Sequence, residues 1–146
     1  YIPYNNYHLG SGGIEYKDIL QVGHINPDYT RNELHRVWVV EATLKEGQRH
    51  IYSKRTFYID EDSWSIVIAD QYNKRGEIWR VSLSYTKNYY ELPSTNSVMD
   101  VYHDLVARRY HARGLDNEEG GTHNYSSVWP NKRYFKPASL RRRGLR

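Results

Sequence analysis

The sequence predicts a mainly β protein built on a curved antiparallel sheet, with a short helix and irregular termini. Three observations indicate this fold class. Apolar and polar residues alternate with a period of two from Glu33 onward, turn sequences separate the alternating runs, and 15 Tyr and 4 Trp supply the large side chains that pack well on a pleated surface. Because only 38% of the residues are hydrophobic, we expect a thin, aromatic-rich core under a sheet with one wet face.

The chain, residues 1–146, reads as a single domain or as the C-terminal portion of a larger half-barrel domain. Residues 1–32 form an irregular lead-in with a short helix, 33–115 an antiparallel meander and 116–146 an irregular tail. No apolar run approaches the roughly 20 residues that cross a bilayer. The chain opens on Tyr1 rather than Met, so we expect a processed or fragmentary protein whose targeting signal lies elsewhere.

The best-defined element is a hairpin made by residues 33–45 and 50–60. If Gly47 and Gln48 form a two-residue loop, residues whose numbers sum to 95 lie opposite each other. This register predicts five favourable cross-strand pairs, which are Val37–Tyr58, Trp38–Phe57, Glu41–Lys54, Leu44–Ile51 and Glu46–Arg49.

Further strands follow along the chain. Residues 64–71 are aliphatic on both faces, which predicts a central strand, and the alternation over residues 77–85 predicts a further strand of the meander. Residues 98–115 match either a helical face or two strands joined by a turn. We favour the two strands.

The net charge of +4 resides in the tail. Four of the 21 Lys and Arg residues are Arg141, Arg142, Arg143 and Arg146, and the 17 that remain equal the 17 Asp and Glu. A nucleic-acid-binding domain more often spreads basic residues over a folded face. We therefore expect no nucleic-acid partner, and interpret the tail as a solvated or docking segment.

The sequence lacks the usual signatures of catalysis. There is no Cys and no Gly-x-Ser-x-Gly motif, and the seven His include no pair with HExxH spacing. Gly10-Ser11-Gly12-Gly13 lacks the preceding strand and the Lys of a phosphate loop, so we interpret it as a linker. We expect neither an enzyme nor a cofactor.

One weak candidate for a metal site is the cluster His35, Asp60 and Asp62, which the hairpin register brings together. The competing interpretation is a strand end whose acidic turn is neutralised by Arg31, Arg36 and His35, and this second interpretation is the more ordinary one.

Four segments carry a family resemblance. They are residues 33–45, 49–52 and 55–64, and the closing Leu140-Arg141-Arg142, supported by Pro3-Tyr4-Asn5 and by residues 26–31. Together they resemble the C-terminal part of a Gram-negative family known as domain of unknown function 1329. Members are similar to outer-membrane lipoprotein-sorting carriers, whose incomplete, strongly curved antiparallel barrel holds acyl chains in an apolar hollow.

The resemblance implies a non-catalytic carrier or binding protein for a lipid or other hydrophobic ligand, in the periplasm or on the periplasmic face of the outer membrane. Its partners would be the N-terminal part of the same protein and an inner-membrane exporter. The expected ligand-binding residues are Trp38, Val40, Phe57, Trp64, Trp79 and Leu83, with Arg55 beside a polar head. The same side chains could instead be plain core, and the alternative function is a structural or interaction module with an Arg-rich docking tail.

Overall fold

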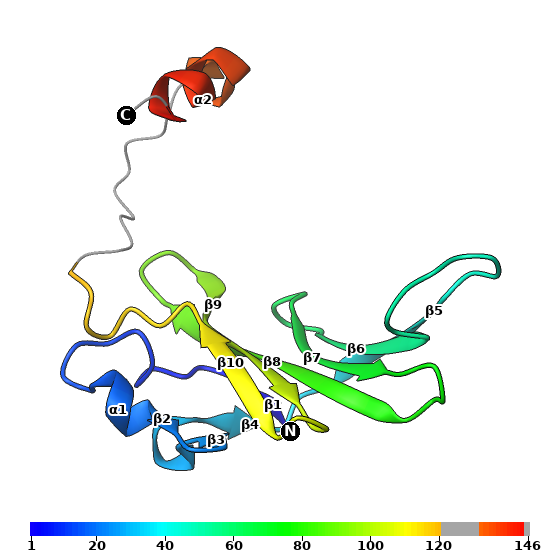
Figure 1. Ribbon diagram of the computed structural model, residues 1–146. Coiled ribbons are helices and arrows are strands. Elements are labelled where there is room, and N and C mark those ends of the chain that lie inside the picture. The colour runs from blue at the N-terminus through cyan, green and yellow to red at the C-terminus, as the bar shows by residue number, and fades with distance from the viewer. Residues whose placement is uncertain (121–131, 145–146) are drawn as a thin grey trace.

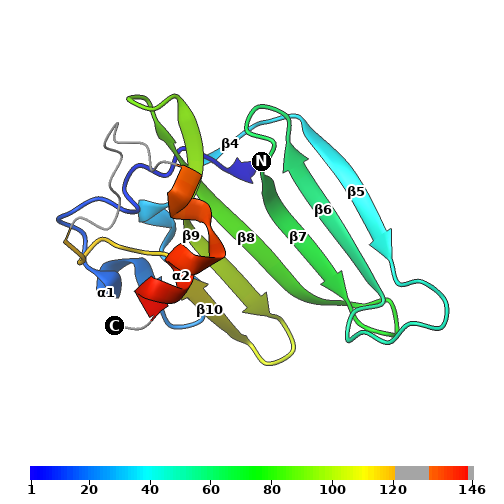
Figure 2. The same ribbon diagram turned by 90° about the horizontal axis from the view of Figure 1, so that it is seen from above.

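The computed structural model describes residues 1–120 and 132–144, and its centre is a six-stranded antiparallel sheet (Figures 1 and 2). Seen from above in Figure 2, the strands lie side by side in chain order, with β5 and β10 at the edges. The strands are β5 (Val37–Thr43), β6 (Lys54–Asp60), β7 (Ile66–Tyr72), β8 (Ile78–Tyr89), β9 (Ser94–Asp104) and β10 (Arg109–Arg113). The predicted mainly β fold class, an open curved antiparallel sheet, is confirmed.

Short elements flank the sheet. Before it come β1 (Ile2–Pro3), α1 (Tyr16–Ile19), β2 (Leu20–Gln21), β3 (His24–Ile25), a 3₁₀ turn η1 (Pro27–Tyr29) and β4 (Asn32–Glu33). After it come a second 3₁₀ turn η2 (Lys132–Phe135) and α2 (Pro137–Gly144). In the described part of the chain, no helix is long and apolar enough to cross a membrane.

We predicted an irregular tail over residues 116–146. This prediction is wrong in part, because the tail contains α2. Proline is favoured in the first turn of a helix, and Ala138, Leu140 and the three arginines 141–143 are good helix formers.

The register predicted for the β5–β6 hairpin is wrong by two residues. Paired residues sum to 97 rather than 95, so Trp38 lies opposite Ile59 and Val40 opposite Phe57. The cause is a longer loop, residues 44–53, whose turn is closed by a hydrogen bond from the Gln48 backbone N–H to the Lys45 carbonyl, 3.1 Å. A shift of two residues leaves every side chain on its predicted face.

The other strand predictions are confirmed in type. The aliphatic segment forms β7, which is central in the sheet, and residues 98–115 supply most of β9 and all of β10 rather than a helix. Strand ends differ from the predicted ends by a few residues, and β8 runs on to Tyr89.

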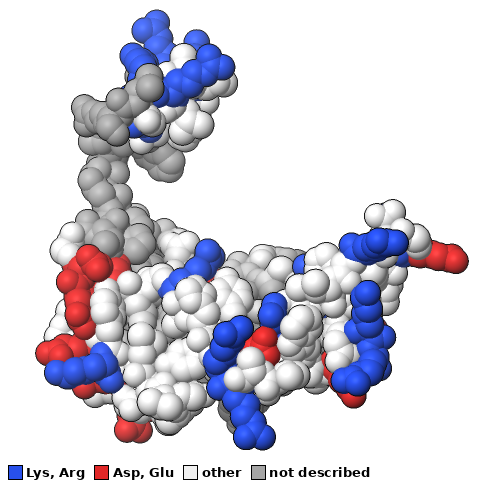
Figure 3. Space-filling view, viewed as in Figure 1, with Lys and Arg blue, Asp and Glu red and all other residues white. Residues whose placement is uncertain are grey.

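The two faces of the sheet differ. The core face carries Leu83, Tyr85, Met99 and Val101, against which the N-terminal segment packs. Figure 1 shows α1 and the β2–β3 hairpin beneath β8, β9 and β10 on this side. We call the opposite side the pocket face, and Figure 3 shows the upper outline of the molecule dipping there, between the body and the raised β5–β6 loop.

The buried core is aliphatic, which corrects the prediction of an aromatic-rich core. Its fully or almost fully buried members are Leu9, Ile19, Ile25, Tyr85, Val98, Met99 and Val101, of which Tyr85 is the one aromatic residue. Half of the non-aromatic members come from the lead-in, which has too little periodicity to predict its burial, and the other half come from β9. Most aromatic rings instead lie at the surface or half-buried.

Two asparagines attach the lead-in to the sheet. Asn6 is fully buried, and its Oδ1 accepts from the Arg31 backbone N–H at 2.7 Å while its own backbone N–H donates to the Thr86 carbonyl at 2.7 Å. Asn117 accepts from the Gly10 N–H at 2.9 Å and donates to the Ser11 carbonyl at 2.9 Å. These contacts join the N-terminal segment to β8 and to the segment that follows β10.

We predict that Val101→Ala lowers the free energy of unfolding by about 1.5–3 kcal/mol, since it removes buried methyl groups from the centre of the core. Val101 is fully buried, whereas Val106 is 75% exposed, so Val106→Ala is a matched control that should change stability by less than about 0.5 kcal/mol. Urea unfolding followed by circular dichroism measures both. Equal losses in the two variants would contradict the position of the core.

Candidate functional site

Two rows of paired residues cross the whole pocket face, because the registers of all six strands align there. The first, which we call the arginine row, runs from edge to edge as Ala42, Arg55, Gln71, Arg80, Asp104 and Arg109. The second, the aromatic row, runs as Val40, Phe57, Ala69, Ser82, Tyr102 and His111. The rows are two residues apart on each strand, or roughly 7 Å.

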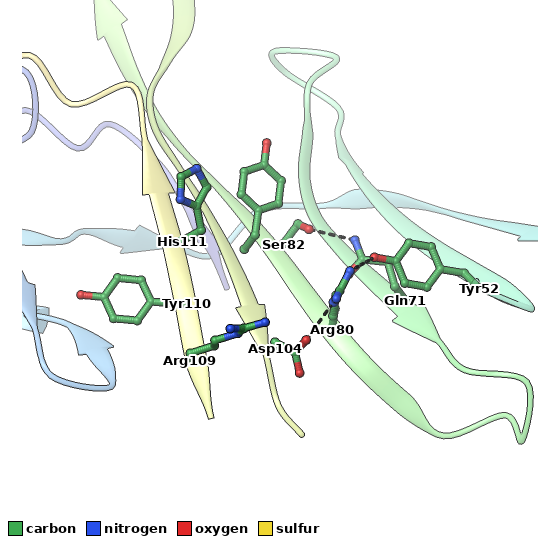
Figure 4. Close-up of a pocket in the computed structure, with 9 residues that line it drawn as sticks. Tyr52, Gln71, Arg80, Ser82, Asp104, Arg109, Tyr110 and His111 are labelled. Atoms are coloured by element: carbon green, nitrogen blue, oxygen red, sulfur yellow. Dashed lines mark hydrogen bonds and ion pairs between the residues drawn. The ribbon is translucent and has the colours of Figure 1, made fainter. Parts of the chain in front are cut away.

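A pocket of about 640 Å³ lies where the two rows cross β7 to β10 (Figure 4). Its lining consists of Gln71, Arg80, Asp104 and Arg109 from the arginine row, Ser82, Tyr102 and His111 from the aromatic row, and Tyr52 and Tyr110 at its margins. Tyr52 comes from the β5–β6 loop, so this loop supplies one wall of the pocket. A volume of this size is typical of a small-molecule site.

Arg80 is held at the centre of the pocket by two hydrogen bonds. Its Nη1 donates to the Tyr52 hydroxyl at 2.9 Å and its Nε to Asp104 Oδ2 at 3.1 Å, as Figure 4 shows. Its guanidinium also lies 4.3 Å from the centre of the Trp79 ring. The Tyr52 hydroxyl and Asp104 raise the pKa of Arg80 against the opposing effect of burial. A hydrogen bond from the Ala107 backbone N–H, with Arg80, lowers the pKa of Asp104.

The Gln71 side chain places a buried hydrogen-bond acceptor without a donor in the same pocket. The residue is 9% exposed, and its Nε2 donates to Ser82 Oγ at 2.8 Å. Its Oε1 has no hydrogen-bond partner among the described residues. A buried amide oxygen without a donor costs about 1–3 kcal/mol, which makes this atom a marker for a missing partner.

The arginine row carries more positive than negative charge. Asp104 forms its ion pair with Arg80, at 3.1 Å. Arg109 lies directly opposite Asp104 in the β9–β10 register, yet within the described part of the chain it makes no ion pair. Arg55, at the other end, contacts the Tyr52 ring, 5.9 Å from its guanidinium carbon to the ring centre. Within the described part of the chain, the row therefore carries two guanidinium groups without an ion pair, Arg109 in the pocket and Arg55 on β6 outside it.

The structure brings together four of the predicted ligand-binding residues. Trp38, Val40, Arg55 and Phe57 share the pocket face of β5 and β6. Trp38 and Val40 are 54% and 44% exposed. They form an apolar extension of the two rows toward the β5 edge.

The other three predicted lining residues lie elsewhere. Trp79 borders the pocket, where its Nε1 donates to Asp104 at 3.3 Å and its ring meets Tyr52 edge-on. Leu83 points to the core face and packs against the buried cluster. Trp64 is 72% exposed in the turn between β6 and β7, where its positive φ of 55° follows from the tight turn.

Sequence reasoning missed most of the pocket. Gln71 ends the aliphatic strand, and a polar residue at a buried strand position was a usable signal. Arg80 was visible as a charged residue within a strand. Arg109, His111 and Tyr52 gave no local signal, because they reach the pocket through pairings between β9 and β10 and through the β5–β6 loop.

The cluster predicted as a metal candidate does assemble, at the far end of β6. One ligand atom from each of His35, Asp60 and Asp62 lies within 4.8 Å of the others. Asp60 is fully buried, and both of its oxygens have partners: Oδ1 meets His35 Nδ1 at 2.8 Å, and Oδ2 accepts from the Ser63 N–H at 2.9 Å and hydroxyl at 2.6 Å. The Tyr4 ring packs 4.2 Å from the His35 ring. These contacts favour a structural role, closing the β6–β7 turn.

The pocket residues are chemically suited to binding. They offer cationic donors, aromatic faces and one unpaired acceptor, and the His111 ring stacks at 6.2 Å on Tyr102. Arginine guanidinium groups match the oxygens of phosphate and carboxylate groups.

Residues 1–141 match the model of a family described as "Protein of unknown function (DUF1329)". The chain is 47% identical over 148 residues to the uncharacterized protein PA3922 of Pseudomonas aeruginosa, an alignment that covers 100% of this chain and 32% of that protein. The chain thus spans about a third of the length of this curated relative.

Two solved structures are also similar. One is a DUF1329 family protein from Desulfovibrio piger, with a TM-score of 0.44 and 16% identity, covering 71% of this chain and 40% of that one. The other is a putative outer membrane lipoprotein-sorting protein domain from Vibrio parahaemolyticus, with a TM-score of 0.42 and 12% identity, covering 72% of this chain and 48% of that one.

We predict that Asp60→Asn destabilises the protein by about 1.5–3 kcal/mol at neutral pH, because hydrogen bonds to a buried charge are lost. Burial opposes ionisation of Asp60, but the hydrogen bonds from Ser63 and His35 outweigh it, and the pKa of Asp60 is lowered. The stabilisation is therefore present above the unfolded-state pKa of about 3.9 and is lost as the pH falls through the folded-state pKa.

The measurement is chemical unfolding of wild type and Asp60→Asn at a series of pH values between neutral and acid. The gap between the two proteins should narrow as the pH falls. Asp62→Asn is the matched control, since the Asp62 side chain is 74% exposed and its loss should cost less than about 1 kcal/mol. Equal costs for the two variants would mean that Asp60 does not hold the turn.

Proposed function

Because this chain belongs to the DUF1329 family, whose description assigns no function, we propose its function from its own surface: it is a non-catalytic envelope protein that binds a lipid or other hydrophobic ligand on the pocket face. The single observation that carries the proposal is the continuity of an apolar strip with a polar pocket on one face of the sheet. The strip is Trp38, Val40 and Phe57 on β5 and β6, and the pocket lies on β7 to β10.

The aromatic row has the length that such a ligand needs, and its apolar end has the exposure. Six strands at about 4.8 Å spacing give a row roughly 24 Å long, close to the length of an extended acyl chain. Each Å² of apolar surface removed from water contributes about 25 cal/mol before the costs of association. A ligand lying along the aromatic row would cover Val40 and reach Phe57, which are partly exposed in the absence of ligand.

Binding without chemistry is consistent with the groups in the pocket. Its central charged residue, Arg80, is held by Tyr52 and Asp104, so it is positioned as a donor rather than as a base. In this proposal the protein works in the periplasm or on the periplasmic face of the outer membrane. Its partners are the remainder of a longer chain and an inner-membrane exporter.

A second function, a structural or interaction module, is favoured by strand β5. This edge strand exposes apolar side chains on both faces, with Trp38 54%, Val39 58% and Val40 44% exposed. Exposed edge strands readily pair with another strand. The three arginines of α2 would add a basic docking segment.

Native mass spectrometry of the full-length protein, purified from its own envelope without detergent, separates the two functions. The binding function predicts an excess mass that disappears on extraction with organic solvent. A bare polypeptide mass that stays unchanged after incubation with envelope lipids would support the interaction module instead.

We predict that Val40→Asp weakens binding of a fluorescent fatty acid by the full-length protein at least about tenfold, since a carboxylate under an apolar ligand loses its hydration. Val39→Asp is the matched control. It places the same charge on the same edge strand but on the opposite face, and should leave the affinity unchanged. Equal effects of the two variants would show that the fatty acid does not lie on the pocket face.

A further inference from the structure

We propose that the arginine row is a head-group site, which takes an oxyanion such as a phosphate that also carries an N–H or O–H hydrogen-bond donor. The inference deepens the proposed function, on which it rests, by naming the chemistry of the polar end of the ligand. Three features of the row carry it: a buried acceptor without a partner, an excess of guanidinium groups, and a wall of aromatic rings.

The unpaired acceptor is Gln71 Oε1. The Gln71 side chain lies in the pocket lining with its Nε2 bound to Ser82, so the oxygen is the free end of the amide (Figure 4). Its neighbours across the strands are Arg55 and Arg80. Neither arginine donates to it in the structure, so we assign to it a donor that the ligand brings.

The excess positive charge defines the second requirement. Asp104 lies between Arg80 and Arg109 in the register and pairs with Arg80 alone at 3.1 Å. In Figure 4 the Arg109 side chain extends toward Asp104 and Arg80 over the pocket. Arg80 on β8 and Arg109 on β10 are two strand spacings, or roughly 10 Å, apart at the backbone, with Asp104 on β9 between them. Asp104 neutralises one of the two guanidinium charges, so one positive charge remains to bind an oxyanion.

The aromatic groups orient the ligand. Tyr52 is fixed by the hydrogen bond from Arg80, and Tyr102 of the aromatic row lines the same pocket. The head therefore meets the arginine row while the rest of the ligand lies over the aromatic row toward Phe57 and Val40. This arrangement assigns polar and apolar ends of one amphipathic ligand to adjacent rows.

The test compares two short-chain phospholipids that share the phosphate and differ in the donor. Dihexanoyl phosphatidylethanolamine has N–H donors, whereas dihexanoyl phosphatidylcholine has none. Titration calorimetry on the full-length protein should show that the first binds at least about fivefold tighter, the factor that corresponds to satisfying one buried acceptor. Equal affinities would overturn the proposal.

Two variants assign the effect to the row. Gln71→Leu should abolish the difference between the two lipids, because the acceptor for the phosphatidylethanolamine N–H is removed. Arg109→Gln should weaken both lipids about tenfold and reduce the dependence of binding on salt. The control is Arg108→Gln, which removes the same charge from a neighbouring residue outside the pocket. It should change neither the affinity for the two lipids nor the dependence of binding on salt. If Arg108→Gln and Arg109→Gln behave alike, the charge of Arg109 is not recognised at a site and the proposal fails.

Thermal unfolding keeps the Gln71→Leu result interpretable. Removing an unpaired buried acceptor should leave the melting temperature of the unliganded protein equal or higher. A lower melting temperature with an unchanged preference for phosphatidylethanolamine would contradict the role of Gln71.

A third probe separates this inference from the proposed function. Glycerophosphoethanolamine carries the head without acyl chains. If it binds as tightly as the lipid, the head-group site stands and the apolar strip is not part of the binding surface. If the fluorescent fatty acid binds the pocket face but the two lipids are bound equally, the proposed function stands and the head-group inference is wrong.

Discussion

The packing of the N-terminal segment against β8 and β9 decides how the rest of the sheet is used. Leu9, Ile19 and Ile25 are buried against Met99 and Val101, and they cover only one face. Because side chains alternate strictly along a strand, this contact assigns every other residue to the opposite face. The residues of the arginine row and the aromatic row lie on the pocket face because the residues next to them in sequence point to the core face.

The coverage of the two faces of the sheet differs between its β10 end and its β5 end. Over β8 to β10 one face is covered by the core and the other carries the pocket, whereas β5 has exposed apolar residues on both faces. A binding surface that joins these regions can offer charge at one end and apolar contact at the other. β5 is also an edge strand, and an edge strand has backbone groups free to pair with another strand.

Polar groups within the sheet are tolerated because most of them satisfy one another. Arg80 has Asp104 and Tyr52, and Asp60 has His35 and Ser63. The two networks look alike in sequence, as charged residues at strand positions, yet they differ in use. Around Asp60 every oxygen has a partner and the effect is to close a turn. Among the described residues around Arg80, the neighbouring Gln71 oxygen has no hydrogen-bond partner and the Arg109 guanidinium has no ion pair, which is why we treat this pocket as the candidate binding site.

The sequence alone determined the period of two, hence the strands, their order and the face on which Trp38, Val40, Arg55 and Phe57 lie. These predictions survived an error of two residues in the hairpin register, because an even shift preserves the faces. The sequence also indicated the contact between His35 and Asp60, because that contact depends on the pairing of a single hairpin. Only the tertiary structure decided the composition of the core and of the pocket. The lead-in is buried by contacts more than 70 residues away, such as that between Asn6 and Thr86. Gln71, Arg80, Asp104 and Arg109 meet only when four strands align and a bulge at Gln71–Tyr72 sets their phase, and local periodicity carries no information about such pairings.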